Sequence, residues 1–145
     1  MNIFFKSASS IITSLCVIIG GIMGYLIGSI DGLVYCLIVF MVIDYITGVV
    51  VAALVDKSLS SSVGFLGIAK KVMIIFLVII SNMLDVYIIG SGSAARTAVI
   101  SFYLINEGIS IIENISQLGI PIPSKLLNLF DNIENIKEKN HQDEN

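Results

Sequence analysis

Acidic and amide side chains gather in the apolar segment INEGISIIEN, which runs from residue 105 to residue 114. Carboxylate and amide groups at membrane depth can relay protons, bind cations or line an aqueous passage. Their spacing brings them to one side of a helix and leaves the other side apolar. Spacing alone leaves open whether this polar stripe packs within one chain or lines a lumen in an oligomer. The residues of the polar stripe are Asn106, Glu107, Ser110, Glu113, Asn114 and Gln117.

A second acidic position, Asp44, lies at the centre of an apolar run within VIDYITGVV. An acidic residue at the middle of a spanning helix opposes insertion by about 2.5 to 3.5 kcal/mol. Asp44 must therefore face protein or water, or carry a proton. Two interpretations stay open, namely a hydrogen bond to a neighbouring helix and a role in a pore or a proton path.

Two further features concern the packing of helices. Gly20, Gly24 and Gly28 recur at every fourth position, which gives one helix face a flat groove suited to close approach of a second helix. That second helix belongs either to the same chain or to another copy. Asp85 and Arg96 flank a short predicted turn, so we expect an ion pair that fixes this hairpin.

Other residue types give no support for catalysis, metal binding or nucleic-acid binding. Cys16 and Cys36 lie in apolar runs without CxxC spacing, and His141 has no second ligand nearby. The segment GFLGIAKK lacks the order GxxxxGK[ST] that cradles a phosphate. The sequence shows no pairing of a nucleophile with a base. We expect a protein that is not an enzyme, needs no cofactor or metal, and does not bind nucleic acid.

The composition predicts that these residues lie in membrane-spanning helices. Of the 145 residues, 56% are hydrophobic and 13% are charged, and the mean hydropathy is +0.96. A spanning helix needs about 20 mainly apolar residues. We expect an all-α integral membrane protein whose residues 1–118 form a bundle of four transmembrane helices, with three as the alternative. The expected spans are residues 11–30, 33–55, 72–90 and 98–118.

Lysines indicate the orientation of these spans. A four-span arrangement places every lysine on one side of the membrane and leaves only Arg96 on the other. Because basic residues favour the cytoplasmic side, both termini are predicted to be cytoplasmic. The lysines are Lys6, Lys57, Lys70, Lys71, Lys125, Lys137 and Lys139.

The remaining residues, 119–145, are expected to form a short cytoplasmic amphipathic helix and a disordered tail. Gly119, Pro121 and Pro123 end the fourth span, and Ser124 is placed to cap the next helix. The apolar face of that helix comprises Leu126, Leu127, Phe130 and Ile133.

The fourth expected span is only marginally apolar. Each large apolar residue favours insertion by about 0.3 to 0.6 kcal/mol, and Glu107 and Glu113 together oppose it by about as much as that set supplies. This helix therefore needs protein partners or water around its polar stripe.

Together these residues make the chain resemble the phage lysis and toxin-secretion holins of Gram-positive bacteria and their phages. The similarity covers residues 44–126 and lies in DYITG, in the serine-rich loop leading to Gly64, Gly67 and a lysine pair, and in Asp85. Its most specific part is NEGISIIEN followed by LGIPIP. The tail departs from the family, since its lysines are offset by acidic residues where such proteins often end in a strongly basic stretch.

The resemblance implies a multi-pass protein of the bacterial cytoplasmic membrane that associates with copies of itself and opens lesions. A cell-wall hydrolase (an endolysin) or a large toxin then leaves the cell, without necessarily binding the holin directly. Two alternatives are kept open. A small ion or proton channel or transporter subunit would use Asp44, Glu107 and Glu113, and an antiholin would delay lysis when expressed with a partner.

Overall fold

The fold is all-helical over the residues that the structure, a computed structural model, describes. These are residues 2–58, 60–90 and 92–128, with side chains described at residue 10 and from residue 12 onward. They contain helices and short connections but no β-strand, as the sequence predicts. The helices are α1 (Asn2–Ile27), α2 (Gly32–Leu54), α3 (Ser61–Leu84), the π-helical turn η1 (Asp85–Ile89) and α4 (Ala94–Gln117).

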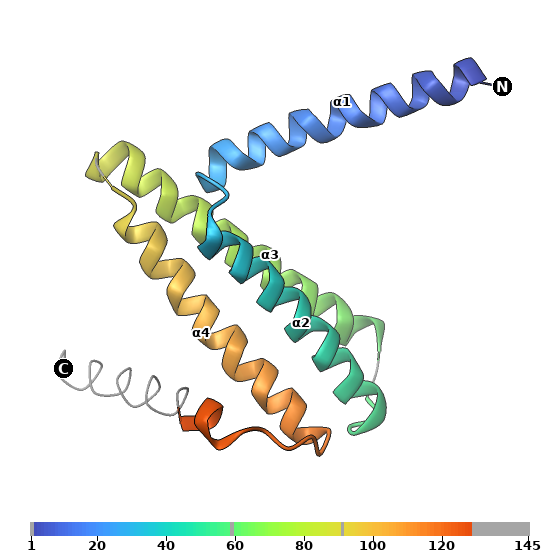
Figure 1. Cartoon of the computed structure of the whole chain (residues 1–145), viewed down its shortest axis with the longest axis vertical. Helices are drawn as coiled ribbons and strands as arrows, with labels where there is room; N and C mark the ends of the chain where they lie inside the picture. The colour runs from blue at the N-terminus through green and yellow to red at the C-terminus, as the bar shows by residue number, and fades with distance from the viewer. Residues whose placement is uncertain (1, 59, 91, 129–145) are drawn as a thin grey trace.

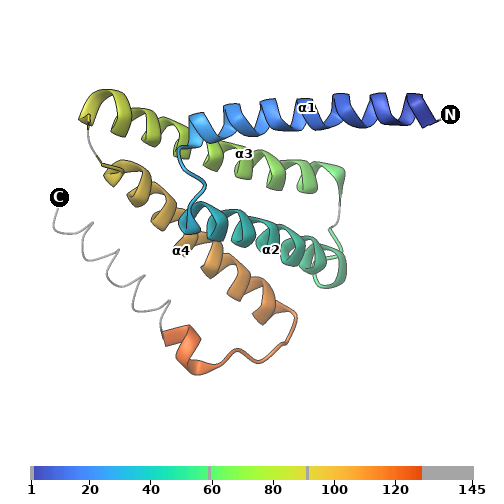
Figure 2. The same ribbon diagram turned by 45° about the horizontal axis from the view of Figure 1, so that its top comes forward.

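Three helical segments of the described chain are long and apolar enough to cross a membrane. They are Gly32–Leu54, Ser61–Ile89 and Ala94–Gln117. In Figures 1 and 2 these segments form one bundle, in which α2 lies against α4 and α3 joins α4 through the turn after η1. These segments support a multi-pass membrane protein.

Helix α1 stands apart from this bundle. Figure 1 shows it running away from the other helices, and only its C-terminal end contacts α3. Its apolar part, Ile12–Ile27, is shorter than the three candidate spans. The described residues thus confirm the second, third and fourth expected spans by length and composition, and the first, residues 11–30, stays a prediction.

The helix ends follow from local capping. Asp31 accepts hydrogen bonds from the backbone N–H groups of Leu33 and Val34, at 3.1 and 3.0 Å, and so begins α2. Ser60 caps α3 in the same way. At the other end of the chain, Gly119 has a φ of 74°, a left-handed conformation that glycine adopts without strain and that ends α4.

Helix α3 begins at Ser61 rather than near the expected start at residue 72. The serine-rich segment that the sequence suggested as a loop instead supplies the N-cap and first turn of the helix. As a result Lys70 and Lys71 lie within α3 instead of preceding it. After α4, residues 124–128 are helical, whereas the rest of the expected amphipathic helix, with Phe130 and Ile133, lies outside the described residues.

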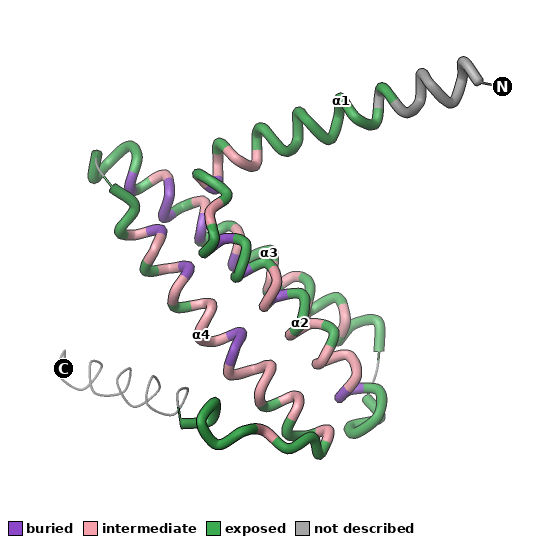
Figure 3. The backbone as a smooth tube through the Cα atoms, viewed as in Figure 1, coloured by how far each residue is buried: buried purple, intermediate pink, exposed green. Residues whose placement is uncertain are grey.

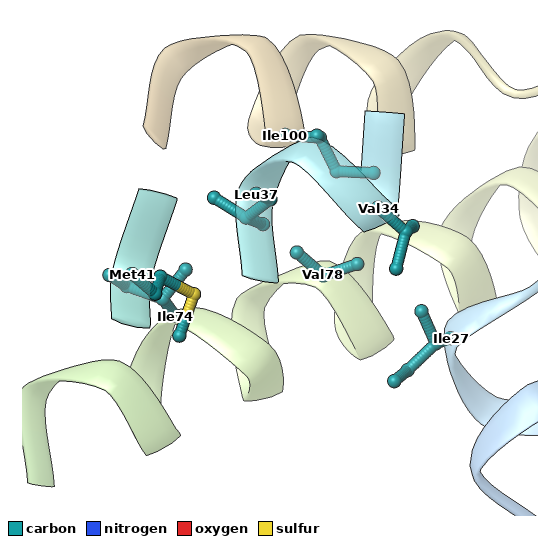
Figure 4. Packing of buried hydrophobic residues seen from close by; sticks show 7 residues of the cluster. All are labelled: Ile27, Val34, Leu37, Met41, Ile74, Val78 and Ile100. Carbon is teal, nitrogen blue, oxygen red and sulfur yellow. The ribbon is translucent and has the colours of Figure 1, made fainter. Parts of the chain in front are cut away.

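A small apolar core lies at the end of the bundle that carries the α3–α4 turn. Figure 4 shows side chains from all four α-helices meeting there, and Figure 3 shows that most other positions on the bundle are exposed or half-buried. An exposed apolar surface of this extent is what a lipid environment solvates. The core residues are Ile27, Val34, Leu37, Met41, Ile74, Val78 and Ile100.

Candidate functional site

The central feature of the bundle is a charge cluster that we define by Asp44 on α2, Lys71 on α3 and Glu107 on α4. Lys71 Nζ lies 2.7 Å from Asp44 Oδ2 and 2.5 Å from Glu107 Oε2, so one ammonium group bridges two carboxylates. The three side chains are only 10 to 17% exposed. This central charge cluster is therefore a network of mostly desolvated charges that joins the three candidate spans.

Amide and hydroxyl groups extend this cluster along α2 and α4. Asn114 Nδ2 donates to Asp44 Oδ1 at 3.2 Å and to Thr47 Oγ1 at 3.0 Å. A Cβ atom added at Gly48 would lie 3.7 Å from the Asn114 amide nitrogen, so this glycine leaves the amide room to approach α2. Asp44 therefore binds both a cation and a neutral amide, and the interhelical hydrogen bond considered from sequence is present.

Tyr45, the next residue of the DYITG segment, fixes the spacing between α2 and α3. A Cβ atom at Gly67 would lie 3.3 Å from the Tyr45 ring, and one at Gly64 would lie 3.5 Å from its hydroxyl oxygen. The two glycines let α3 approach the ring closely. The glycine-containing start of α3 thus serves helix packing beside the charge cluster.

A cavity of about 380 Å³ adjoins the central charge cluster between α2, α3 and α4. Its walls combine apolar side chains with the charged groups of the cluster, with Lys70 and with the hydroxyl of Ser110. The lining residues are Asp44, Tyr45, Gly48, Val49, Ala52, Val63, Gly64, Leu66, Gly67, Lys70, Lys71, Glu107, Ser110 and Asn114.

The structure divides the polar stripe of α4 into two groups. Glu107 is buried, and Ser110 and Asn114 line the cavity with it. Glu113 and Gln117 are exposed, and Asn106 is half-buried. Only the first group therefore lines the same cavity as Asp44.

A second network, which we call the turn cluster, comprises Asp31, Asp85 and Arg96. Asp85 is 1% exposed and accepts hydrogen bonds from the backbone N–H groups of Ala95 and Arg96, at 3.0 and 2.8 Å. A carboxylate placed against a helix N-terminus satisfies unpaired N–H groups and is favoured by the helix dipole. Asp85 therefore caps α4 from the preceding turn.

The guanidinium of Arg96 contacts other partners than expected. Its Nη1 lies 2.7 Å from Asp31 Oδ2, and its Nε and Nη2 donate to the backbone carbonyls of Ile27 and Ser29, at 2.8 and 2.6 Å. The expected side-chain ion pair between Asp85 and Arg96 is thus replaced, because Asp85 binds the backbone N–H of Arg96 while the side chain crosses to the α1–α2 connection. The hydrogen bond with Arg96 is also the main reason why the pKa of Asp31 is lowered from its usual value.

Gly28 belongs to this turn cluster rather than to the predicted glycine groove. Its φ of 87° places it beyond the end of α1, and a Cβ atom there would lie 2.6 Å from Asn82 Oδ1 and 3.2 Å from Arg96 Nε. Gly20 and Gly24 do lie on α1, and added Cβ atoms there would meet no described residue within 4 Å apart from the backbone of α1 itself. The groove therefore holds two of the three predicted glycines, and it is open.

Sequence reasoning missed the role of Lys71. It placed this lysine at the membrane surface because the third helix was expected to begin after it. Two carboxylates at similar depth require a cation nearby, and that requirement was the available signal. In the described residues no group of three or more histidine, cysteine or acidic side chains is arranged to hold a metal ion.

Comparison with known proteins identifies the family of the chain. The model of the bacteriophage holin family matches residues 21–135. This chain belongs to the bacteriophage holin family. Holin family proteins are non-enzymatic membrane proteins, and the resemblance drawn from DYITG and NEGISIIEN is confirmed.

Individual relatives come from Gram-positive bacteria and one of their phages. An uncharacterized protein of Listeria monocytogenes is 47% identical over 111 residues, which are 77% of this chain and 78% of the relative. An uncharacterized 14.9 kDa protein of Clostridium perfringens is 37% identical over 119 residues, covering 82% of this chain and 89% of the relative. A protein of Bacillus phage phi105 named a probable holin is 35% identical over 98 residues, covering 68% and 71%. No solved structure matches the chain.

Proposed function

We propose that this protein is a holin that assembles in the bacterial cytoplasmic membrane and opens lesions through which an endolysin or a large toxin leaves the cell. The observation that carries the proposal is the central charge cluster, held between apolar helices in a member of the holin family. Charged groups in such a position can either stay paired inside one chain or line an aqueous path.

The charged groups of the central charge cluster can lie in two alternative surroundings. In the single chain, Asp44 and Glu107 share the ammonium group of Lys71, and each is screened from lipid by the neighbouring helices. In an open lesion the same groups would face water, which solvates charge better than the bundle interior does. When copies of the chain bind the second arrangement more tightly than the first, their association shifts the equilibrium toward the second.

Two features of the surface favour association with copies of the same chain. Gly20 and Gly24 leave a groove on α1 in which an added Cβ atom would meet no other described part of the chain within 4 Å. Glu113 and Gln117 are exposed on α4, within a segment long enough to span the membrane. We infer that copies meet through α1 and the exposed polar side of α4.

The proposed topology has four spans, with α1 as the first and both termini in the cytoplasm. Lys57, Lys70 and Lys125 then lie toward the cytoplasmic side, and Arg96 lies at the opposite end of the bundle. This distribution agrees with the bias of basic residues toward the cytoplasm. The endolysin or toxin is linked to the holin by passage through the lesion, and direct binding is not required.

Expression in bacteria tests the proposal. Membrane potential and release of a folded cytoplasmic reporter protein are followed after induction, with the variant Glu107→Gln measured in parallel. We expect abrupt loss of potential together with reporter release. Continued growth and an intact potential at high membrane levels of the protein would contradict the proposal, and delayed lysis of a co-expressed holin would indicate an antiholin.

The cavity beside two carboxylates favours a second candidate, a small channel or transporter subunit for protons or cations. This candidate predicts graded and selective ion flux without release of the reporter protein. It also predicts that Glu107→Gln abolishes the flux. Release of the folded reporter protein separates the two functions, because a lesion lets it pass and an ion channel does not.

A further inference from the structure

The first part of α3, residues 61–71, is attached to the bundle more weakly than the rest of the helix, and we call it the α3 arm. The structure describes every residue of the arm, and none of them is fully buried. The apolar core takes Ile74 and Val78 from α3, and the buried polar residues Ser81 and Asn82 follow them. The core therefore holds α3 beyond the arm, and other contacts hold the arm itself.

The contacts of the arm are of two kinds. Lys71, its last residue, forms the two ion pairs of the central charge cluster. Gly64 and Gly67 lie against the ring of Tyr45 on α2. Neither glycine has a side chain that could interlock with the ring. The ion pairs are also weak in net terms, because the cost of removing buried charges from water offsets most of their attraction.

A hollow lies on each side of this attachment. The cavity of about 380 Å³ is lined by Tyr45 and Lys71, and the same two residues line a second hollow of about 370 Å³ between α2 and α3. Tyr45 and Lys71 thus separate the charged cavity from an apolar hollow. Empty space beside a contact leaves its atoms without partners for dispersion attraction. The other lining residues of the apolar hollow are Ile38, Met41, Val42, Ile68, Val72 and Ile75.

Helices α2 and α4, by contrast, form a well-packed pair. Helix α2 packs on α4 more extensively than on α3, and Asn114 of α4 donates hydrogen bonds to Asp44 and Thr47 of α2. The connection between α2 and α3, residues 55–60, can extend to about 20 Å. The chain therefore allows the arm to leave α2 and α4 while that pair stays together.

We propose that the bundle opens when the α3 arm swings away from α2 and α4 about the apolar core, and that Tyr45 and Lys71 are the contacts that give way. The two hollows then merge, and water reaches the central charge cluster. Hydration of the separated charges removes their desolvation cost, so the open arrangement is stabilised once water has entered. This inference rests on the proposed holin function and assigns the step that regulates it.

The test locks the arm in the full chain with a reducible cross-link. Cys16 and Cys36 are first replaced by serine. Val49→Cys on α2 and Leu66→Cys on the arm then place two thiols in the walls of the cavity, where a reducible bifunctional thiol reagent joins them. Liposomes that carry the protein and a trapped fluorescent protein report lesion formation. We expect the cross-linked chain to lose nearly all release and a reductant to restore it.

The matched control joins the same two helices within the apolar core. Met41→Cys and Ile74→Cys both belong to that core, which Figure 4 shows, and this cross-link should leave release unchanged. Release that persists in the locked arm, with the cross-link verified by mass spectrometry, would overturn the inference. An equal loss in both pairs would also overturn it, because α2 and α3 would then part along their whole length. Absence of release from the chain without cross-links would instead contradict the proposed holin function.

A pair of variants at Tyr45 tests the ring contact separately. Tyr45→Ala removes the ring between the two hollows and should hasten release, whereas Tyr45→Phe keeps the ring and should leave the rate unchanged. Helix content measured by circular dichroism shows that both variants fold. Equal release rates in the two folded variants would contradict the role of the ring.

Discussion

Replacing Lys71 by methionine removes the only cation in the central charge cluster while keeping a side chain of similar length. Two carboxylates that are 10 to 17% exposed then lose a partner at 2.5 and 2.7 Å. Removing one member of a buried ion pair commonly costs about 3 to 5 kcal/mol. We expect about 3 kcal/mol, the lower end, because one carboxyl group can take up a proton instead.

The free energy of unfolding in mixed detergent micelles, followed by circular dichroism, measures this effect. The neutral triple variant Asp44→Asn, Lys71→Met, Glu107→Gln should recover most of the loss, because no unpaired charge is left inside the bundle. Lys70→Met is the control one residue away, and its exposed side chain should change stability by less than about 0.5 kcal/mol. Equal losses in Lys71→Met and Lys70→Met would refute the reasoning.

Three further predictions concern other contacts of the bundle. Asn114→Ala should lower the free energy of unfolding by about 1 to 2 kcal/mol through lost hydrogen bonds to α2, measured in the same micelles. Gly28→Ala should lower it by about 1 to 3 kcal/mol, because φ is 87° and the new Cβ atom would lie 2.6 Å from Asn82 Oδ1. Gly20→Ala, where the new Cβ atom meets open space, should leave the free energy of unfolding unchanged, and similar unfolding curves for both variants would contradict this. Asp31 has a lowered pKa through Arg96, so its contribution to stability is present above its usual value of 3.8 and is lost as the pH falls through the lowered pKa. Thermal unfolding between pH 6 and about pH 2 should show this loss in the native chain and a flatter profile in Asp31→Asn.

Hydropathy and spacing predicted the helical class, the positions of α2 and α4 and the importance of Asp44 and Glu107, because apolar runs and buried charges are local signals. The start of α3 was missed, since a serine-rich segment reads equally as a loop and as an N-cap with a first turn. That one boundary moved Lys71 from the membrane surface into the bundle. The Arg96 contacts could not be predicted either, because they join the α1–α2 and α3–α4 connections, which are distant in sequence.

The polar face of α4 shows a similar limit. Spacing placed six polar residues on one broad side. The structure places three of them at the cavity, leaves Glu113 and Gln117 exposed and half-buries Asn106. The division depends on where α2 and α3 lie around α4, which periodicity within one helix does not contain. Glu107 and Asn114 contact side chains of α3 and α2, whereas Glu113 is exposed.

The accessibility of position 110 to a charged thiol reagent tests the central claim most directly. Cys16 and Cys36 are exposed and free, so both are first replaced by serine, and Ser110→Cys is compared with Ile109→Cys on another side of α4. The reagent is applied to cells before and after the membrane potential collapses. We predict that Ser110→Cys becomes reactive only after the collapse, while Ile109→Cys stays unreactive. Unchanged reactivity of Ser110→Cys through the collapse would contradict the claim that the cavity side of α4 turns toward water.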